Sequence, residues 1–422
     1  MSGITNNGRV PRLRFPEFRG AEPWKVNRFD EVLSPVVRER PKPAETYLGL
    51  GLRSHGKGTF LKLLEDPAKN SMDQLYEVKA NDLIVNITFA WEGAVAIAKE
   101  RDEGALVSHR FPTYTFEKGR TTPGFFRYFI LDKQFVYNLG VISPGGAGRN
   151  RVMSKNDFMK LQVALPSPAE QQKIAECLSS LDDLITLEAQ KLDSLKAHKK
   201  GLMQQLFPRE GETQPRLRFP EFQNAGEWQT LPLAALADKI MVGIASAATH
   251  AYRETGVPML RNQNIKEGKI DDSSLLFIDP AYEAAHKNKR LRSGDVITVR
   301  TGYPGLSAVV TERYHNAQCF TSLITRPKKS LLDAKYLCAF INSEIGKRFV
   351  LGAEAGGAQK NVNAGVLEAL PVYLPELDEQ KRIASCLTSL DDLITAQTQK
   401  LEALKTHKKG LMQQLFPQVS EE

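Results

Sequence analysis

The N-terminal half of the chain carries a loop whose side chains suit contact with a polyanion. The stretch from Gly51 to Phe60 is rich in glycine and includes Arg53, His55 and Lys57. It lacks the spacing of a Walker loop, which argues against nucleotide binding. Arginine and lysine bind phosphates or the O6 and N7 atoms of guanine, so we take these three residues as candidate DNA contacts, with a solvated turn as the alternative. Weaker candidates beside other turn signals are Asn86, Trp91, Glu92, His109 and Arg110.

The C-terminal half holds a second set of such side chains. Carboxamides are concentrated after Leu260, and asparagine or glutamine can bind N6 and N7 of adenine through two hydrogen bonds. Asx turns and a sheet-surface arginine are the alternative interpretation. The candidate base contacts in this half are Arg261, Asn262, Gln263, Asn264, Arg300 and Tyr303. Candidate phosphate contacts, which position a protein without specifying sequence, follow glycines in both halves at Arg149, Asn150, Lys360 and Asn361.

No catalytic site is predicted. Glu77-Val-Lys79 has the E-x-K shape of a metal-dependent nuclease core, but no correctly placed Pro-Asp precedes it and the corresponding stretch is Arg290-Leu-Arg292. The sequence lacks an N-P-P-[FY] motif, a glycine-rich loop for S-adenosylmethionine and a P-loop. The four cysteines form no C-x-x-C pair, so we expect no metal site and interpret them as buried, reduced thiols.

Composition and charge indicate the location of the chain and the class of its binding partner. Its 422 residues allow two or three domains, and a net charge of +8 favours a polyanionic partner such as nucleic acid. No apolar run approaches the roughly 18 residues of a membrane span. The N-terminal stretch is polar, without the apolar core of a signal peptide. We therefore expect a cytoplasmic, nucleoid-associated prokaryotic protein.

The elements that must position these residues are duplicated. Residues 170–208 recur at 379–417, an offset of 209, with roughly three-quarters of the positions identical. The octapeptide at 11–18 recurs unchanged at 215–222. Between these matched ends lie two segments of about 140 residues with short β-rich runs, glycine turns and amphipathic stretches, which predict α+β domains. The predicted segments are domains at 1–166 and 209–375 and helical segments at 167–208 and 376–422.

Both repeated segments are predicted to form long helices. Ser167-Pro-Ala-Glu170 is a capping-box pattern, and apolar residues follow at alternating spacings of four and three, as in a coiled-coil seam. About 39 residues give a helix of about 58 Å. Polar residues interrupt both seams at matching places, Glu188 and Lys199 against Gln397 and Lys408, which predicts antiparallel packing of the two helices on each other. The alternative is an ordinary core stripe in a helical bundle. The seam residues are Ile174, Leu178, Leu181, Ile185, Leu192, Leu195, Leu202 and Leu206, then Ile383, Leu387, Leu390, Ile394, Leu401, Leu404, Leu411 and Leu415.

With this organisation the chain resembles the specificity (S) subunits of Type I restriction-modification systems, the HsdS family. The resemblance covers nearly all of the chain. It rests on R-L-R-F-P-E-F at 12–18 and 216–222, on a G-D-[VIL]-I strand near 294–297, and on L-P-x(2–3)-E-Q…I-A…L-x-x-L-D-x-L-I runs from Leu165 and Leu374. The first half departs from the pattern with Asn81-Asp82 in place of Gly-Asp.

The resemblance implies a function without catalysis. Each variable segment, 25–164 and 229–373, would be a target recognition domain that reads one half of a bipartite double-stranded DNA site. The helices would set the spacing and dock two methyltransferase subunits, with restriction subunits joining them. S-adenosylmethionine, Mg²⁺ and ATP would then bind the partner subunits, and this chain would bind no cofactor. The competing hypotheses are a coiled-coil scaffold that binds proteins and a nuclease or methylase in its own right.

Overall fold

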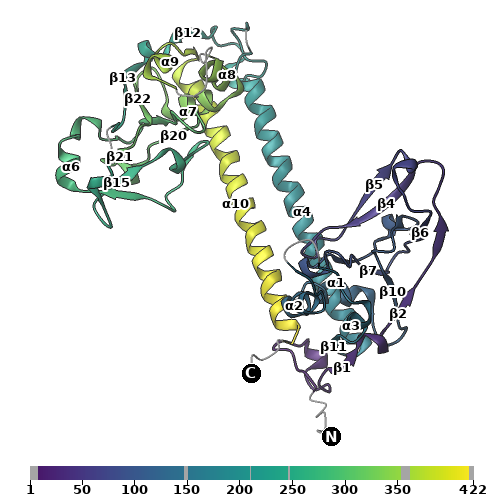
Figure 1. The fold of residues 1–422 in the computed structure, drawn as a ribbon. Coiled ribbons are helices and arrows are strands. Elements are labelled where there is room, and N and C mark those ends of the chain that lie inside the picture. Colours follow the sequence, from purple (N-terminus) through teal and green to yellow (C-terminus); the bar gives the residue numbers. More distant parts are fainter. Residues whose placement is uncertain (1–7, 147–150, 210, 246–247, 353–361, 418–422) are drawn as a thin grey trace. The chain divides into compact units, whose positions relative to one another are not determined.

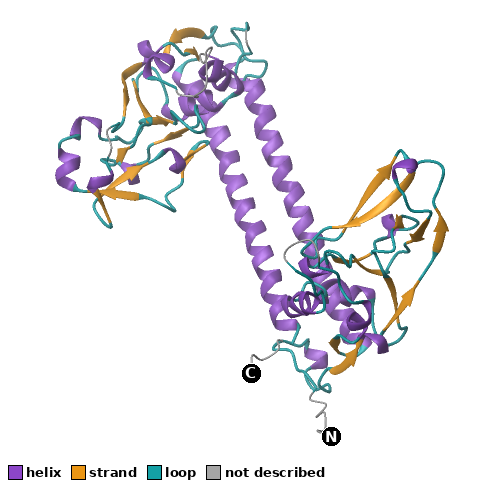
Figure 2. Ribbon diagram, viewed as in Figure 1, coloured by secondary structure: helices purple, strands orange, loops and turns teal. Residues whose placement is uncertain are grey.

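A computed structural model describes residues 8–146, 151–209, 211–245, 248–352 and 362–417 (Figure 1). The chain forms two compact units: unit 1 comprises Met1–Glu188 with Lys400–Glu422, and unit 2 comprises Ala189–Gln399. Two long helices, α4 (Pro168–Leu206) and α10 (Leu377–Leu415), pass through both units. Each unit is therefore one α+β domain together with parts of both helices (Figure 2). The boundaries of the two domains and two helical segments that the sequence predicts remain predictions.

The described residues of unit 1 form three sheets. A five-stranded sheet has the order β3 (Glu39–Pro41), β6 (Gln74–Glu77), β9 (Leu106–Val107), β4 (Tyr47–Leu52) and β5 (Thr59–Leu64). A four-stranded sheet has the order β2 (Leu33–Val36), β10 (Thr113–Phe116), β7 (Leu83–Val85) and β8 (Val95–Ile97). Strands β1 (Lys25–Arg28) and β11 (Gln162–Leu165) pair beside α1 (Pro123–Phe129), α2 (Lys133–Val141) and α3 (Lys155–Met159). The core is rich in phenylalanine and includes Leu415, the last residue of α10, and Phe416, which follows it.

Unit 2 has a similar arrangement with different numbers of strands in its sheets. One four-stranded sheet has the order β13 (Ala237–Val242), β22 (Leu323–Pro327), β19 (Val296–Thr298) and β20 (Ser307–Val309). Another has the order β14 (Tyr252–Arg253), β18 (Leu276–Ile278), β15 (Val257–Leu260) and β21 (Gln318–Cys319). The short pairs are β12 (Gln229–Pro232) with β23 (Pro371–Leu374) and β16 (Ile265–Lys266) with β17 (Lys269–Ile270). The helices are α5 (Leu233–Leu236), α6 (Pro280–Ala284), α7 (Ala334–Asn342), α8 (Glu344–Gly352) and α9 (Ala364–Glu368).

Asn81-Asp82 in the first domain and Gly294-Asp295 in the second occupy the same turn. Asn81 and Gly294 both have left-handed backbones, with φ of 68° and 91°. Asparagine tolerates this conformation better than most residues, which explains how Asn81 can replace glycine. The aspartate that follows is buried in each domain and pairs with an arginine: Asp82 with Arg38 at 2.5 Å and Asp295 with Arg326 at 2.8 Å. The motif thus stabilises the turn before β7 and β19.

The helix start was predicted correctly, but the role of its acidic residue was not. The Ser167 hydroxyl accepts a hydrogen bond from the Glu170 N–H at 3.3 Å, as a capping residue does. The Glu170 carboxylate does not complete a capping box. It accepts two hydrogen bonds from Arg14, at 2.9 and 2.5 Å, and one from Trp24 Nε1 at 3.4 Å. Glu170 therefore joins the entry segment of the domain to α4.

Unit 2 contains the same joint. Arg218 donates to the Glu379 carboxylate at 2.9 and 2.7 Å, and Trp228 Nε1 donates to it at 3.2 Å. The glutamine that follows each glutamate adds backbone contacts: Gln171 Nε2 donates to the Arg120 carbonyl, and Gln380 Nε2 donates to the Leu331 carbonyl. The repeated Arg, Trp and Glu-Gln positions thus attach each domain to the helix that follows it.

The helices pack antiparallel, as predicted. In unit 1, Asp182 of α4 pairs with Lys408 of α10 at 2.5 Å, and Glu188 pairs with Lys400 at 2.5 Å, so positions ascend along one helix and descend along the other. In unit 2, Lys199 pairs with Asp391 at 2.6 Å. All of the predicted seam residues are buried or half-buried. The lysines that interrupt the seam are therefore partners of acids on the opposite helix.

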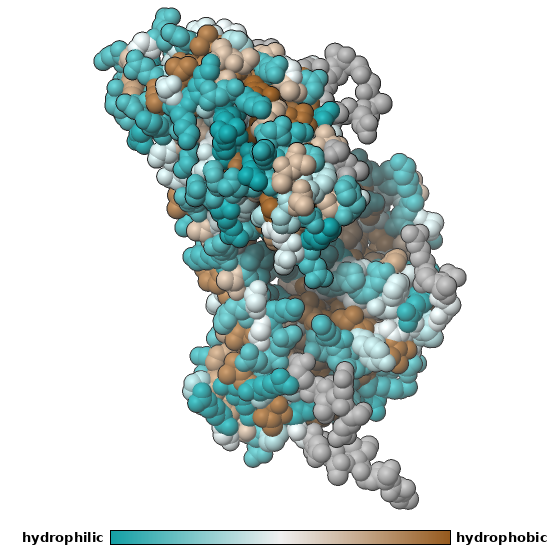
Figure 3. Space-filling view, turned by 90° about the vertical axis from the view of Figure 1, so that its left-hand side faces the viewer, coloured by the Kyte–Doolittle hydropathy of each residue, from teal (hydrophilic) through white to brown (hydrophobic). Residues whose placement is uncertain are grey.

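The surface is mainly polar. The face shown in Figure 3 is largely hydrophilic, with apolar residues in small groups. Among the exposed apolar side chains, Leu184 and Leu393 occupy equivalent positions of α4 and α10 and are 39% and 54% exposed. No helix within the described ranges is long and apolar enough to cross a membrane.

Candidate nucleic-acid interface

In the N-terminal domain the predicted glycine-rich loop is the tight connection between β4 and β5. Its tip is fixed to the turn between β7 and β8: the His55 N–H donates to the Glu92 carbonyl at 2.7 Å, and the Gly56 N–H donates to the Gly93 carbonyl at 2.9 Å. The Ser54 hydroxyl also donates to the Glu92 carboxylate at 2.7 Å. A side chain at Gly56 would clash with Leu131, whose Cδ2 lies 2.3 Å from the ideal Cβ position. The loop is therefore held in one conformation.

The three basic candidates of this loop are all exposed. Arg53 donates to the Thr59 carbonyl at 2.9 Å, and its guanidinium lies 5.2 Å from the centroid of the Phe60 ring. These contacts orient Arg53 while leaving donors to solvent. The predicted residues Arg53, His55 and Lys57 are thus brought together on a rigid loop.

Trp91 lies in the turn that receives this loop, within a short 3₁₀ helix, Ala90–Glu92. Its ring is half-buried, and the guanidinium of Arg151 lies 5.3 Å from the ring centroid. Arg151 is itself held by the carbonyls of Ser143 and Gly140, at 3.1 and 2.8 Å. The sequence did not single out Arg151, although it directly follows the predicted pair Arg149 and Asn150.

The remaining candidate DNA contacts of this domain are of two kinds, exposed basic residues and an asparagine that hydrogen-bonds to the backbone. His109 and Arg110 are exposed, and Arg110 donates to the Thr88 hydroxyl at 3.3 Å, which places it beside the same turn. The Asn86 side-chain oxygen accepts from the Thr88 N–H at 3.1 Å, so Asn86 forms an Asx turn. The structure therefore brings the β4–β5 loop, the β7–β8 turn, Arg110 and Arg151 into one basic surface, with Asn86 stabilising its backbone.

In the C-terminal domain the predicted carboxamides form a short 3₁₀ helix, Asn262–Asn264, after β15. Asn264 is only 1% exposed; its oxygen accepts from the Arg261 N–H at 2.9 Å and its amide donates to the Asp271 carbonyl. Its side chain is used within the fold, which corrects the prediction that it contacts a base. Gln263 is exposed, and Arg261 is half-buried with one nitrogen donating to the Ser274 carbonyl at 2.9 Å.

Asn262 links this segment to the turn between β19 and β20. Its amide donates to the Thr301 hydroxyl at 2.8 Å, and its oxygen accepts from the Ser322 hydroxyl at 2.8 Å. Arg300 beside Thr301 is half-buried, whereas Tyr303 in the same turn is 79% exposed. Two predicted stretches that are separated in sequence therefore form one surface. Arg149, Asn150, Lys360 and Asn361 lie outside the described residues.

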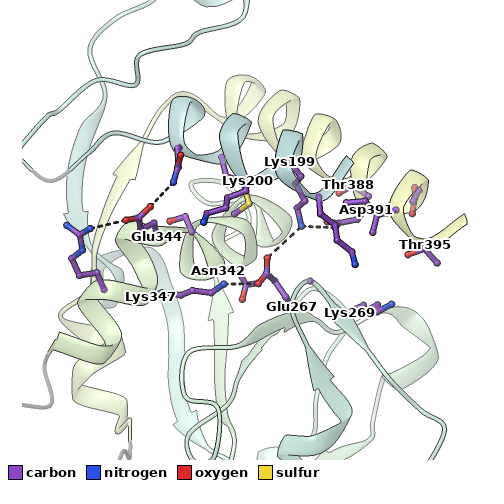
Figure 4. Close-up of a pocket in the computed structure, with 18 residues that line it drawn as sticks. Lys199, Lys200, Glu267, Lys269, Asn342, Glu344, Lys347, Thr388, Asp391 and Thr395 are labelled. Atoms are coloured by element: carbon purple, nitrogen blue, oxygen red, sulfur yellow. Dashed lines mark hydrogen bonds and ion pairs between the residues drawn. The ribbon is translucent and has the colours of Figure 1, made fainter. Parts of the chain in front are cut away.

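A cleft of about 910 Å³ in unit 2 lies between α4, α10, α8 and the β16–β17 turn (Figure 4). Glu267 from this turn pairs with Lys347 at 2.7 Å and approaches Lys199 at 3.9 Å, and Lys199 pairs with Asp391. Across the cleft, Glu344 pairs with Arg348 at 3.0 Å. The contacts of Glu267 with Lys347 and Lys199 hold the β16–β17 turn against the helices.

The four cysteines differ in burial. Cys319 and Cys338 are buried, and burial raises the pKa of each thiol to about 12. Cys177 and Cys386 are only half-buried, which corrects the expectation that all four are buried. Within the part of the chain that the structure describes, no three His, Cys, Asp or Glu residues are grouped so that they could hold a metal ion.

A family model described as the Type I restriction modification DNA specificity domain matches residues 58–197 and 226–406, one match in each half. The chain belongs to this family. Among Type I specificity proteins, it is 27% identical to the Type I restriction enzyme MjaVIII specificity subunit of Methanocaldococcus jannaschii over 276 residues. That match covers 63% of each chain, less than two thirds of the relative's length.

A second relative and two solved structures are more distant. The Type I restriction enzyme EcoKI specificity subunit of Escherichia coli is 23% identical over 149 residues, 34% of this chain and 31% of that one. A chain in a structure described as "Structural basis underlying complex assembly and conformational transition of the type I R-M system" is 18% identical, with a TM-score of 0.57 over 93% of this chain and 97% of that one. The Type I restriction-modification S subunit from M. genitalium is 14% identical, with a TM-score of 0.57 over 97% and 100%. These structures share the fold.

Proposed function

We propose that this specificity subunit reads a bipartite DNA site, with one α+β domain on each half. The carrying observation is that two domains of similar architecture each place a basic or carboxamide loop against the turn of a neighbouring hairpin. In the N-terminal domain the loop supplies Arg53, His55 and Lys57. In the C-terminal domain it supplies Arg261 and Gln263. These side chains can donate to phosphates and base edges in a groove.

The two helices would set the spacing between half-sites and dock the methyltransferase subunits. The docking proposal is supported by exposed leucines outside the seam at the same position of α4 and α10, Leu184 and Leu393. One exposed position is repeated on both helices, which would suit two copies of one partner. Restriction subunits would join this complex, which would work in the cytoplasm. S-adenosylmethionine, Mg²⁺ and ATP would bind the partner subunits, and this chain would do no chemistry itself.

The test is to map methylated adenines in DNA from cells that carry this chain with its methyltransferase partner. We expect a motif of two short half-sites separated by a fixed gap, with one methylated adenine on each strand. The purified chain alone, given DNA, Mg²⁺ and S-adenosylmethionine, should yield neither cuts nor methyl groups. A continuous motif, or no chain-dependent methylation, would contradict the proposal, and a product from the chain alone would contradict its non-catalytic part.

A protein-binding scaffold is the second candidate, favoured by the coiled-coil helices and their exposed leucines. Salt separates the two, because binding through many phosphate contacts weakens steeply as counterion release becomes less favourable. DNA affinity of the complex should therefore fall on the order of 10³-fold or more between 50 and 200 mM salt if six or more phosphates are contacted. Salt-insensitive or absent DNA binding would favour the scaffold.

A further inference from the structure

The turn that receives the basic loop has the same construction in both domains. β7 and β8 pair from Leu83↔Ile97 to Val85↔Val95, and β19 and β20 pair from Val296↔Val309 to Thr298↔Ser307. Trp91 and Tyr303 each lie four positions before the first residue of the second strand. Both hairpins thus carry one aromatic residue at the same place in the turn.

The backbone around these aromatic residues is also matched. Two positions after each of them a glycine has a left-handed conformation, Gly93 with φ of 71° and Gly305 with φ of 88°. A valine from the following helical region packs against each glycine: the ideal Cβ position lies 3.4 Å from Val136 in one domain and 3.3 Å from Val350 in the other. A valine from a helix therefore packs against the glycine of both turns.

In each domain a polar segment that follows a strand of the neighbouring sheet hydrogen-bonds to this turn. The segment after β4 hydrogen-bonds to Glu92 and Gly93, and the segment after β15 hydrogen-bonds through Asn262 to Thr301. The aromatic ring consequently lies within the turn that supports the proposed DNA-reading side chains. A tyrosine that is 79% exposed leaves apolar ring surface in water, and a contact with a partner would bury it.

We propose that Trp91 and Tyr303 are equivalent specificity residues, each packing its ring against a thymine methyl group in the half-site of its own domain. The inference rests on the proposed function, because it requires that each domain read one half-site. Apolar contacts of this kind are part of major-groove readout. Arg151, stacked on Trp91, would bring positive charge toward the nearby phosphates.

The test uses the complex of the full chain with its methyltransferase partner and duplexes that carry the mapped site. Discrimination is the ratio of affinities for the intact duplex and for a duplex with one half-site scrambled. We expect Tyr303→Ala to lower discrimination about tenfold at one half-site and to leave the other unchanged. Trp91→Ala should do the same at the opposite half-site. Tyr303→Phe keeps the ring and should stay within about twofold of the wild type, because the ring face makes the contact.

Intrinsic fluorescence gives a second measurement that does not depend on a folded alanine variant. The chain has three tryptophans, and Trp24 and Trp228 are buried, so Trp91 is the one that a quencher in solvent reaches. Subtracting the fluorescence of a Trp91→Phe complex from that of the wild-type complex gives the emission of Trp91. Acrylamide should no longer quench this emission when the duplex is bound. Unchanged quenching would overturn the role of Trp91.

The outcomes separate the two proposals. If the wild-type complex shows no discrimination at either half-site, the proposed function fails. If the wild type discriminates but the alanine variants act on neither half-site, on the same half-site or equally on both, the equivalence of Trp91 and Tyr303 fails alone.

Discussion

Removing the carboxylate of Glu170 should loosen the N-terminal domain from its helix. Glu170 and Arg14 have side chains only 2% and 7% exposed, and the carboxylate also accepts from Trp24 Nε1. Glu170→Ala would leave the buried guanidinium without its anion, which typically costs about 3–5 kcal/mol of unfolding free energy. Arg14 keeps hydrogen bonds to the carbonyls of Ala21 and Glu22, so we expect about 3 kcal/mol, the low end.

The assay is thermal unfolding combined with amide hydrogen exchange. For a unit of this size, about 3 kcal/mol corresponds to a fall of roughly 6–12 °C in the transition of unit 1. Exchange should rise first at the Leu13 N–H, which donates to the Gln414 carbonyl at 3.0 Å next to the joint. Glu379→Ala should produce the same shift in unit 2, because Arg218 and Trp228 lose the same acceptor.

The matched control is Glu17→Ala in the same entry segment. Glu17 pairs with Lys173 at 3.3 Å, but both side chains are about half exposed, and such pairs contribute little to stability. We expect no measurable shift from this variant. If Glu170→Ala shifts the transition no more than Glu17→Ala does, the joint does not stabilise the unit and the reasoning is wrong.

Three further predictions concern single features. Asn81→Val should lower the free energy of unfolding in urea by about 1–2 kcal/mol, because a β-branched residue disfavours the left-handed backbone. Asn81→Gly should leave this free energy unchanged, and equal losses from the two variants would contradict the prediction. Iodoacetamide should not label Cys319 or Cys338 in the folded chain at pH 8, since burial raises the pKa of both thiols; rapid labelling detected by mass spectrometry would refute it. The hydrogen bonds from Arg290, and to a smaller extent from Gln318, lower the pKa of Glu283. Stability that is present above pH 4.5 should therefore be lost as the pH falls through the lowered pKa, and Arg290→Ala should weaken this dependence in urea titrations.

The parts of the fold that could be predicted are those encoded locally. The helix from Ser167 was predicted from a cap and a seven-residue period, and α4 covers Pro168–Leu206. The partner of Glu170 could not be predicted from the same pattern, because Arg14 lies 156 positions away and a capping box explains the glutamate equally well. The unchanged repeat of Arg14 and Trp24 as Arg218 and Trp228 was the available signal.

The candidate interface shows the same limit. Glycine turns and basic residues located both loops, but whether a carboxamide faces solvent depends on neighbours that are distant in sequence. Asn264 binds the Asp271 carbonyl and Asn262 binds Thr301 and Ser322, and no feature of the stretch itself separates them from exposed Gln263. Arg151 was missed because its partner is a ring 60 positions earlier, Trp91, which only the fold brings to it.

The pattern of repetition has a physical explanation in these contacts. The residues that recur include those that attach a domain to a helix, Arg and Trp from the entry segment with Glu and Gln from the helix start. They also include residues that pair the helices, such as Asp182 with Lys408 and Lys199 with Asp391. Each requires a charged or hydrogen-bonding partner of fixed geometry, so a substitution on one side would leave a buried or seam charge unpaired. The loops that face solvent carry no such requirement. Arg53-Ser-His in one domain and Arg261-Asn-Gln in the other can therefore differ while the same joint and the same hairpin turn hold both.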